Sequence, residues 1–190
     1  MANSMVRLFV FAAPSGSGKT TIVRDVLKCY PEFVFSISAT TRKKRPSEID
    51  GVDYYFLEEE DFKKKIEQNS FIEWEKFYDY YYGTLKSQID NNIEHKLNTV
   101  FEVDVKGAVS IKNNYPDAVL IFIAPPSIEE LRKRLIQRNT ETETDLKKRI
   151  ERAEMELSYA GKFDYVVYNN DLESAKEEVK KIIENKLKEA

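Results

Sequence analysis

The octapeptide Ala13-Pro-Ser-Gly-Ser-Gly-Lys-Thr20 decides the fold of this chain. It follows the mostly apolar run 7–12, which is typical of a buried strand, and it precedes apolar residues at helical spacing over 22–27. A strand, a glycine-rich turn and a helix in this order define a phosphate-binding loop, or P-loop. We therefore assign the binding of a nucleoside triphosphate to Ala13, Pro14, Ser15, Gly16, Ser17, Gly18, Lys19 and Thr20.

Each position of this loop has a chemical reason. Gly16 and Gly18 permit backbone torsions that turn several N–H groups toward one anion. Lys19 supplies a mobile positive charge for the β- and γ-phosphates, and the hydroxyl of Thr20 is a ligand for Mg²⁺. The usual pattern begins with glycine, whereas this chain has Ala13. We expect the loop to keep its shape provided that Ala13 has a negative φ.

Outward from the loop, strand-like and helix-like patterns alternate. Further apolar runs occupy 33–38, 99–105, 119–124 and 165–168. Helical patterns occupy 59–69, 85–97, 107–114, 128–138, 145–160 and 172–187. Strands that are apolar on both faces and are separated by amphipathic helices predict an α/β fold, with a parallel sheet covered by helices on both sides.

Two segments break this alternation. Residues 39–96 are rich in charged and aromatic side chains, and residues 126–160 carry many charges on two helical patterns. We interpret both as lobes inserted into a single domain of 190 residues. The core of that domain is then 1–38, 97–125 and 161–190.

Composition excludes several classes of protein. With 30 basic against 33 acidic residues the net charge is −3, which argues against nucleic acid or an anionic membrane as a partner. The longest apolar run, 118–124, is far shorter than the ~20 residues that cross a bilayer. Cys29 has no second cysteine to pair with, and His95 lies among polar residues, which predicts a solvated helix position. We expect a cytoplasmic protein.

A second apolar run, 100–105, contains two acidic residues near its end. Glu102 and Asp104 would share one face of a strand that reaches residue 105. Carboxylates at the carboxyl end of a parallel strand point toward the ligand site of an open α/β sheet. We therefore expect Glu102 or Asp104 to orient Mg²⁺ through water, or to contact an acceptor nucleotide.

The first inserted segment resembles a known family. Its motifs Ser36-Ile-Ser-Ala-Thr-Thr-Arg42, Asp50-Gly-Val-Asp-Tyr-Tyr-Phe56, Phe71-Ile-Glu-Trp74 and Tyr81-Tyr-Gly-Thr84 occur in the order and at the distances of guanylate kinases. The resemblance continues to Asn169-Asn-Asp-Leu172. It implies a P-loop nucleoside monophosphate kinase fold, in which 39–96 is a GMP-binding lobe and 126–160 is a helical lid. It also implies transfer of a phosphoryl group from ATP to GMP or dGMP, with Mg²⁺.

The resemblance assigns the acceptor site residue by residue. It implies that Arg42, Arg45, Tyr54 and Tyr82 hold the phosphate of GMP, and two guanidinium forks suit a dianion better than lysines do. Glu73 would accept hydrogen bonds from the N1–H and N2 amino groups of guanine. The complete implied set of GMP contacts is Ser38, Arg42, Arg45, Tyr54, Glu73, Tyr82, Thr84 and Asp104.

The resemblance also assigns the lid and the transfer step. Arg138 and Arg149 match lid arginines that close on the transferring group, although arginines such as Arg152 can instead pair with a neighbour such as Glu156 on a helix surface. Asn169 matches the residue next to adenine. The implied catalytic residues are Lys19, Arg45, Arg138 and Arg149.

Other readings stay open at this point. Another nucleoside monophosphate kinase would share the P-loop but accept a different base. A non-catalytic guanylate-kinase-like binding module would use the same lobe for phosphorylated peptides, although such modules have lost the phosphate loop that Lys19 and Thr20 preserve here. A P-loop ATPase with a mechanical role leaves the motifs between Ser38 and Thr84 without a purpose. The oligomeric state is left open.

Overall fold

The stretch before the P-loop forms the central strand of a parallel sheet, in a computed structural model that describes residues 6–77, 79–137 and 143–189. The strand order is β2-β7-β1-β8-β9, and every pairing is parallel. The strands are β1 (Leu8–Ala12), β2 (Val34–Phe35), β7 (Thr99–Glu102), β8 (Val119–Ala124) and β9 (Tyr165–Tyr168). All residues of β1 and β8 are buried, which confirms the predicted parallel sheet with two covered faces.

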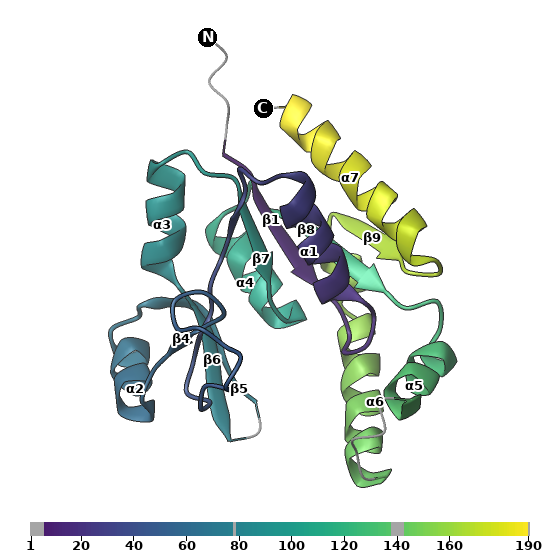
Figure 1. Ribbon diagram of the computed structural model, residues 1–190, viewed down its shortest axis with the longest axis horizontal. Helices are drawn as coiled ribbons and strands as arrows, with labels where there is room; N and C mark the ends of the chain where they lie inside the picture. Colours follow the sequence, from purple (N-terminus) through teal and green to yellow (C-terminus); the bar gives the residue numbers. More distant parts are fainter. Residues whose placement is uncertain (1–5, 78, 138–142, 190) are drawn as a thin grey trace.

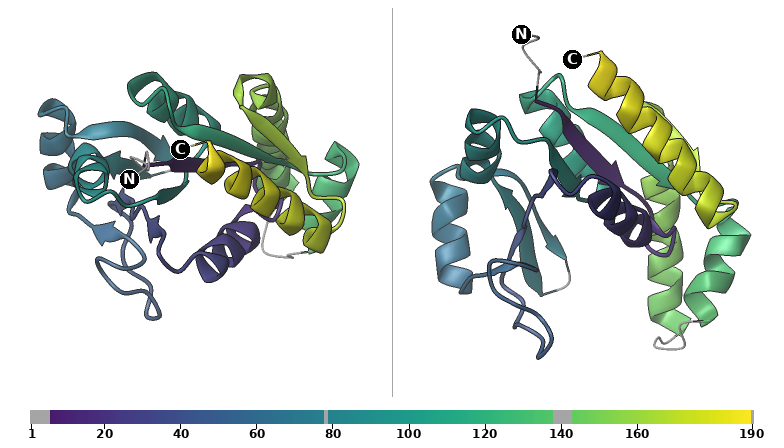
Figure 2. Two further views of the ribbon diagram at one scale, coloured as in Figure 1. Left: turned by 90° about the horizontal axis from the view of Figure 1, so that it is seen from above. Right: turned by 45° about the horizontal axis from the view of Figure 1, so that its top comes forward.

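Helices cover both faces of this core sheet. On one face, α1 (Lys19–Cys29) and α7 (Leu172–Lys188) pack against Phe9 and Phe11. On the other face, α4 (Val105–Asn114) packs against Val10 and Ala12. Figure 2 shows α1 and α7 on one side of the sheet and α4 on the opposite side. Successive residues of β1 thus point into two separate apolar layers, as expected for a strand.

Residues 39–96 contain a second sheet that the sequence patterns did not predict. Its order is β4-β3-β6-β5. The strands are β3 (Ala39–Thr40), β4 (Tyr55–Phe56), β5 (Phe71–Phe77) and β6 (Tyr80–Leu85), with α2 (Glu59–Glu67) and α3 (Lys86–Glu94) beside them. We call these strands the small sheet. Its own apolar cluster is small and centres on Phe62 stacked on Phe71, with ring centroids 4.3 Å apart.

The second inserted segment is a pair of helices, as predicted. The helices are α5 (Ile128–Gln137) and α6 (Glu143–Leu157), and α6 ends three residues before the predicted end; a short 3₁₀ helix follows at Ala160–Lys162. Figure 1 shows the small sheet and the α5–α6 pair both extending past the carboxyl ends of the core strands. In the described parts of the chain, no helix has the length and apolar character needed to cross a membrane.

Three predicted elements need comment. The strand expected over 99–105 ends at Glu102, so the expectation that Glu102 and Asp104 share a strand face is wrong. Asp104 instead caps α4, and its Oδ1 accepts a hydrogen bond of 2.6 Å from the N–H of Gly107, a role that aspartate favours. The strand expected over 33–38 is only two residues long. His95 is exposed at the end of α3, which confirms its predicted surface position.

Candidate active site

The P-loop lies between β1 and α1, at the carboxyl edge of the core sheet. Gly16 and Gly18 have φ values of 93° and 89°, which only glycine adopts readily, and the N–H of Ser17 donates to the carbonyl of Pro14 at 3.1 Å. Among the described residues other than glycine, positive φ occurs only at Asn69 and Lys96. Ala13 therefore meets the condition under which alanine can replace the first glycine of the motif.

Lys19 and Thr20 lie at the start of α1, facing the end of β7. The Nζ of Lys19 donates to the carbonyl of Val103 at 2.9 Å and lies 3.9 Å from Oε1 of Glu102. Burial lowers the pKa of Lys19, and the nearby Glu102 acts in the opposite direction. The hydroxyl of Thr20 donates to Oε1 of Glu102 at 2.5 Å. This hydroxyl and carboxylate are oxygen ligands of the kind that Mg²⁺ prefers.

Asn169 braces the P-loop from the other end of the chain. It is buried, and its Nδ2 donates to the carbonyl of Ser17 at 2.8 Å. A Cβ atom placed on Gly18 would lie only 2.4 Å from the same Nδ2. The side chain of Asn169 therefore supports the loop directly, and its predicted place next to adenine stays a prediction.

We expect Gly18→Ala to raise the KM for ATP by about tenfold, because a left-handed conformation costs a residue with a Cβ roughly 1–2 kcal/mol and Asn169 must also move. Gly161→Ala is the matched control, since a Cβ at Gly161 meets nothing within 4 Å. Steady-state kinetics with varied ATP measures both variants. An unchanged KM in Gly18→Ala would contradict this account of the loop.

A second group of residues lies on the small sheet, where Glu73 on β5 is paired with Thr84 on β6. The hydroxyl of Thr84 donates to Oε1 of Glu73 at 2.5 Å, and Thr84 is buried. Burial raises the pKa of Glu73 to about 7, while the hydrogen bond from Thr84 acts against this shift. Glu73 and Thr84, which were both predicted to contact guanine, are thus in direct contact with each other.

Arg42, Tyr54 and Tyr82 gather beside this pair. The guanidinium of Arg42 donates to both carboxylate oxygens of Glu48, at 2.7 and 3.0 Å, and lies 5.4 Å from the centre of the Tyr54 ring. The rings of Tyr54 and Tyr82 are 6.2 Å apart, edge to face. The hydrogen bond to Glu48 raises the pKa of Arg42, so its charge is secure. A guanidinium has five N–H donors, so besides Glu48 it can also donate to an oxyanion, such as a phosphate, that lies next to the two phenols.

Glu48 is a residue of this group that sequence reasoning missed as a site residue. Besides Arg42, its carboxylate accepts from the backbone N–H of Arg45 at 2.8 Å and lies 4.0 Å from the Arg45 guanidinium. An acidic residue three positions after the second arginine of a basic loop was the signal available. Glu48 thereby fixes the loop that carries both arginines.

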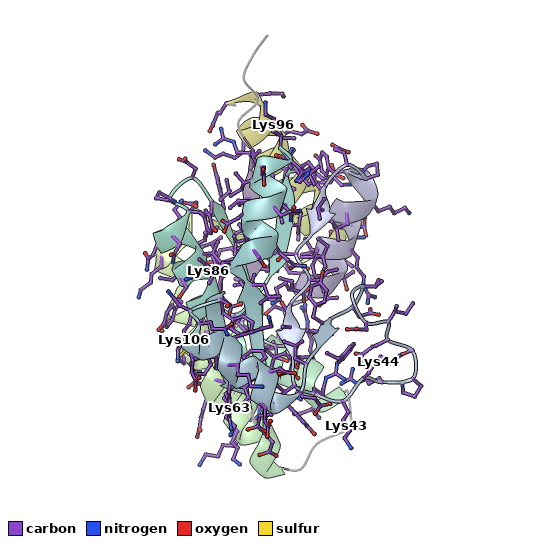
Figure 3. The ribbon with its side chains drawn as sticks, turned by 90° about the vertical axis from the view of Figure 1, so that its left-hand side faces the viewer. Lys43, Lys44, Lys63, Lys86, Lys96 and Lys106 are labelled. Atoms are coloured by element: carbon purple, nitrogen blue, oxygen red, sulfur yellow. The ribbon has the colours of Figure 1, made fainter. Side chains whose placement is uncertain are left out.

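The rest of the basic loop points into solvent. The side chain of Arg45 is 71% exposed, and Lys43 and Lys44 are exposed as well. Figure 3 shows Lys43 and Lys44 on the loop between β3 and β4, away from the strands. Ser38 enters this region through its backbone, whose carbonyl accepts from the N–H of Tyr55 at 2.9 Å. The structure therefore places Arg42 in the site and Arg45 at its rim.

The third group comes from α6 and the cap of α4. Arg152 donates to Glu75 on β5 at 2.9 Å, lies 3.7 Å from Asp104, and donates to Glu156 at 3.0 Å. The pair with Glu156 confirms the helix-surface pairing considered from the sequence, whereas the contacts with Glu75 and Asp104 were missed. Arg149 lies three residues earlier on the same helix. Arg138, the other predicted lid arginine, lies outside the described residues.

The core fold, its P-loop and the polar small sheet together define a P-loop phosphotransferase of the nucleoside monophosphate kinase class. A family model described as guanylate kinase matches residues 5–186. The chain belongs to the guanylate kinase family.

Similar proteins agree with this assignment. The chain is 46% identical to a guanylate kinase of Thermotoga maritima over 93% of this chain and 86% of the relative. It is 52% identical to a guanylate kinase of Chlorobaculum tepidum over 87% of this chain and 86% of the relative. The crystal structure of guanylate kinase from Anaplasma phagocytophilum superimposes with a TM-score of 0.75 at 27% identity, covering 97% of this chain and 88% of that one.

Proposed function

We propose that this enzyme transfers the γ-phosphoryl group of ATP to GMP, and also to dGMP, giving GDP or dGDP and ADP. The observation that carries the proposal is the pair of Glu73 with the buried Thr84, near Arg42. Guanine presents the N1–H and the N2 amino group side by side, and an ionised carboxylate accepts from both. Adenine has no such pair of donors. A buried polar site rejects the mismatched base because its own groups would stay unpaired.

The register of the small sheet supports one ligand that reaches both polar groups. Tyr82 and Thr84 are two residues apart on β6, so their side chains share a face of the strand. Thr84 belongs to the pair that would read the base, and Tyr82 lies with Arg42 and Tyr54 at the group that suits a phosphate. The two ends of a nucleoside monophosphate would thus meet complementary chemistry on one surface.

The donor site is the P-loop, and Mg²⁺ accompanies ATP there. The hydroxyl of Thr20 would hold the cation, with Glu102 orienting its water ligands, as their oxygen chemistry fits. Bound Mg²⁺ neutralises charge on the phosphates. Lys19 would leave the carbonyl of Val103 and follow the γ-phosphoryl group. Arg45, Arg138 and Arg149 would supply the remaining positive charge around it.

No general base is required for this transfer. A nucleoside monophosphate has a second pKa near ~6, so its attacking oxygen is mostly ionised at pH 7. What the protein must do is bring two anions into line and stabilise the charge that they share. The lysine and arginine side chains of the site serve that purpose.

We also propose that the molecule works as three parts. The core consists of 1–38, 97–125 and 161–190, the GMP-binding lobe of 39–96 and the lid of 126–160. Both lobes extend past the carboxyl edge of the core sheet, so their closure would cover the P-loop from two sides (Figure 1). Closure would exclude water, which otherwise competes as an acceptor for the phosphoryl group.

A panel of nucleoside monophosphates tests the proposal. With ATP and Mg²⁺, release of ADP is measured in a coupled assay for GMP, dGMP, AMP, UMP and CMP in turn. We expect turnover with GMP and dGMP and little with the others. Preference for another base would point to a different monophosphate kinase. No turnover with any of them would favour the alternative of a non-catalytic binding module.

The raised pKa of Glu73 predicts a pH dependence. Guanine binding needs the ionised carboxylate, so affinity for GMP should be full above pH 7 and should fall as the pH drops through about 7. Below that pH we expect the KM for GMP to rise by up to about tenfold for each pH unit, because the ionised fraction of Glu73 falls tenfold, which corresponds to 1.36 kcal/mol. Glu73→Gln should lose this step and keep only the one from the phosphate of GMP near ~6. An identical profile in both proteins would contradict the role of Glu73.

A further inference from the structure

Arg152 on α6 joins three separately placed carboxylates. Its guanidinium contacts Glu75 on β5 at 2.9 Å, Asp104 at the start of α4 at 3.7 Å, and Glu156 on its own helix at 3.0 Å. The first contact joins the α5–α6 pair to the small sheet, and the second joins it to the core. Arg152 is therefore a point where all three parts of the molecule meet.

Glu75 occupies a particular place on the small sheet. It lies two residues after Glu73 on β5, so both side chains share a face, and in the ladder it is paired with Tyr82. Glu73 faces the proposed guanine, and Tyr82 belongs to the group proposed for the phosphate. Two residues of a strand span roughly 7 Å. Glu75 is thus level with Tyr82, at the end of the proposed acceptor site that would hold the phosphate.

The guanidinium of Arg152 compensates the negative charge of the carboxyl groups of Glu75 and Asp104. Burial and the neighbouring Asp104 raise the pKa of Glu75 to about 7. Burial acts to raise the pKa of Asp104 as well, but hydrogen bonds from Glu75 and from the N–H of Gly107, together with the charge of Arg152, lower it, so Asp104 is the group of the two that stays ionised. These side chains are only 32% and 19% exposed, which makes an uncompensated charge costly. The planar guanidinium can donate to several carboxylate oxygens at fixed angles, which an ammonium group cannot do.

The helix that carries Arg152 also carries a proposed catalytic arginine. Arg149 precedes Arg152 by three residues on α6, so the two side chains project from the same side of the helix. Any shift of α6 that makes or breaks the contact with Glu75 also moves Arg149. The acceptor site and the lid arginine are therefore mechanically connected through one side chain.

We propose that Arg152 is a positioning residue which, through Glu75 and Asp104, couples occupation of the acceptor site to the position of the lid helix α6. This inference rests on the proposed function, because the ligand that orders β5 is taken to be GMP. GMP would fix β5 and Glu75, Glu75 would hold Arg152, and α6 would then present Arg149 to the donor phosphates. By reciprocity, a donor nucleotide that draws the lid closed would tighten GMP binding by the same factor.

The test measures this coupling directly. Titration calorimetry gives the Kd for GMP with and without a non-hydrolysable ATP analogue and Mg²⁺. We expect the analogue to tighten GMP binding at least about fivefold in the wild-type protein, in the usual range of coupling between sites. In Arg152→Ala and in Glu75→Ala we expect less than about twofold, with Arg152→Lys in between because it keeps the charge without the fork. Melting temperatures show which variants are folded.

A matched control comes from the same lid. Lys133 on α5 lies 3.9 Å from Glu130 of its own helix, so Lys133→Ala removes an ion pair that stays within the lid. We expect wild-type coupling in this variant. The double variant Arg152→Ala/Glu75→Ala should resemble the single variants in kcat/KM for GMP, because both remove the same contact.

The outcomes separate the two proposals. A wild-type protein that phosphorylates GMP, together with full coupling in Arg152→Ala, would overturn this inference and leave the proposed function intact. If the double variant loses kcat/KM for GMP by the product of the two single losses, Arg152 and Glu75 act independently, which would overturn the inference as well. A wild-type protein that does not phosphorylate GMP in the monophosphate panel would overturn the proposed function itself. If Arg152→Ala does not fold, Arg152→Lys and Glu75→Ala decide the question.

Discussion

Lys19→Ala is expected to lower kcat by roughly 10²- to 10³-fold or more, the range seen when one group that stabilises transition-state charge is removed. The ammonium group of Lys19 donates to the carbonyl of Val103, 2.9 Å away, next to the P-loop. The other lysine of α1, Lys28, lies in the last turn of the helix, so it cannot replace Lys19 at the loop. Single-turnover and steady-state rates with ATP, Mg²⁺ and GMP measure the loss.

The fold should survive this substitution. Alanine is the best helix former, and removing a cation whose pKa is lowered by burial relieves a desolvation cost. Lys28→Ala is the matched control, because Lys28 is exposed in the last turn of the same helix. Rates near wild type in folded Lys19→Ala would refute the assignment of the P-loop as the donor site.

Glu73→Gln is expected to lower kcat/KM for GMP by roughly 10²-fold or more while changing the KM for ATP by less than about twofold. A glutamine of the same shape presents one acceptor and one donor, so its amide N–H₂ faces a donor group of guanine. The mismatch leaves buried polar groups unpaired, which is the most discriminating kind of loss in a binding site. A GMP titration that shows unchanged affinity would rule out Glu73 as the residue that reads the base.

The stability of Glu73→Gln provides a check on its folding. The pKa of Glu73 in the folded protein, about 7, lies above its ordinary value of 4.5, so the folded state binds more protons than the unfolded state between those values. Stability from this residue is therefore greatest at low pH and is lost as the pH rises through 7. At pH 8 we expect Glu73→Gln to melt no earlier than the wild-type protein. Glu60→Gln, on the exposed face of α2, is the control for both measurements.

The P-loop was predictable because its signal is local. Residues 13–20 form a continuous segment, and the glycines, Lys19 and Thr20 each have a fixed place in it. The core sheet was predictable for a similar reason, since strands buried on both faces are apolar throughout. By contrast, the end of β7 at Glu102 was missed, because the sequence does not distinguish an aspartate that caps the next helix from one that belongs to the strand.

The small sheet escaped prediction for a physical reason. One face of β5 carries the acidic residues Glu73 and Glu75, and the other carries Trp74, which is 47% exposed. The sequence of β5 therefore lacks the regular alternation of buried apolar and exposed polar residues that marks a half-buried strand. Its candidate site residues were predicted only through the family resemblance. Contacts such as Arg152 with Glu75 join residues 77 positions apart, and no local pattern reports such a distance.

The bond from Asn169 to Ser17 spans 152 positions of the chain, and it has a consequence for biosynthesis. While the ribosome is still making residues before 169, the nascent chain already contains the whole P-loop but not the amide that supports it. We expect such an intermediate to bind ATP poorly, so nucleotide cannot assist folding until residue 169 has been made.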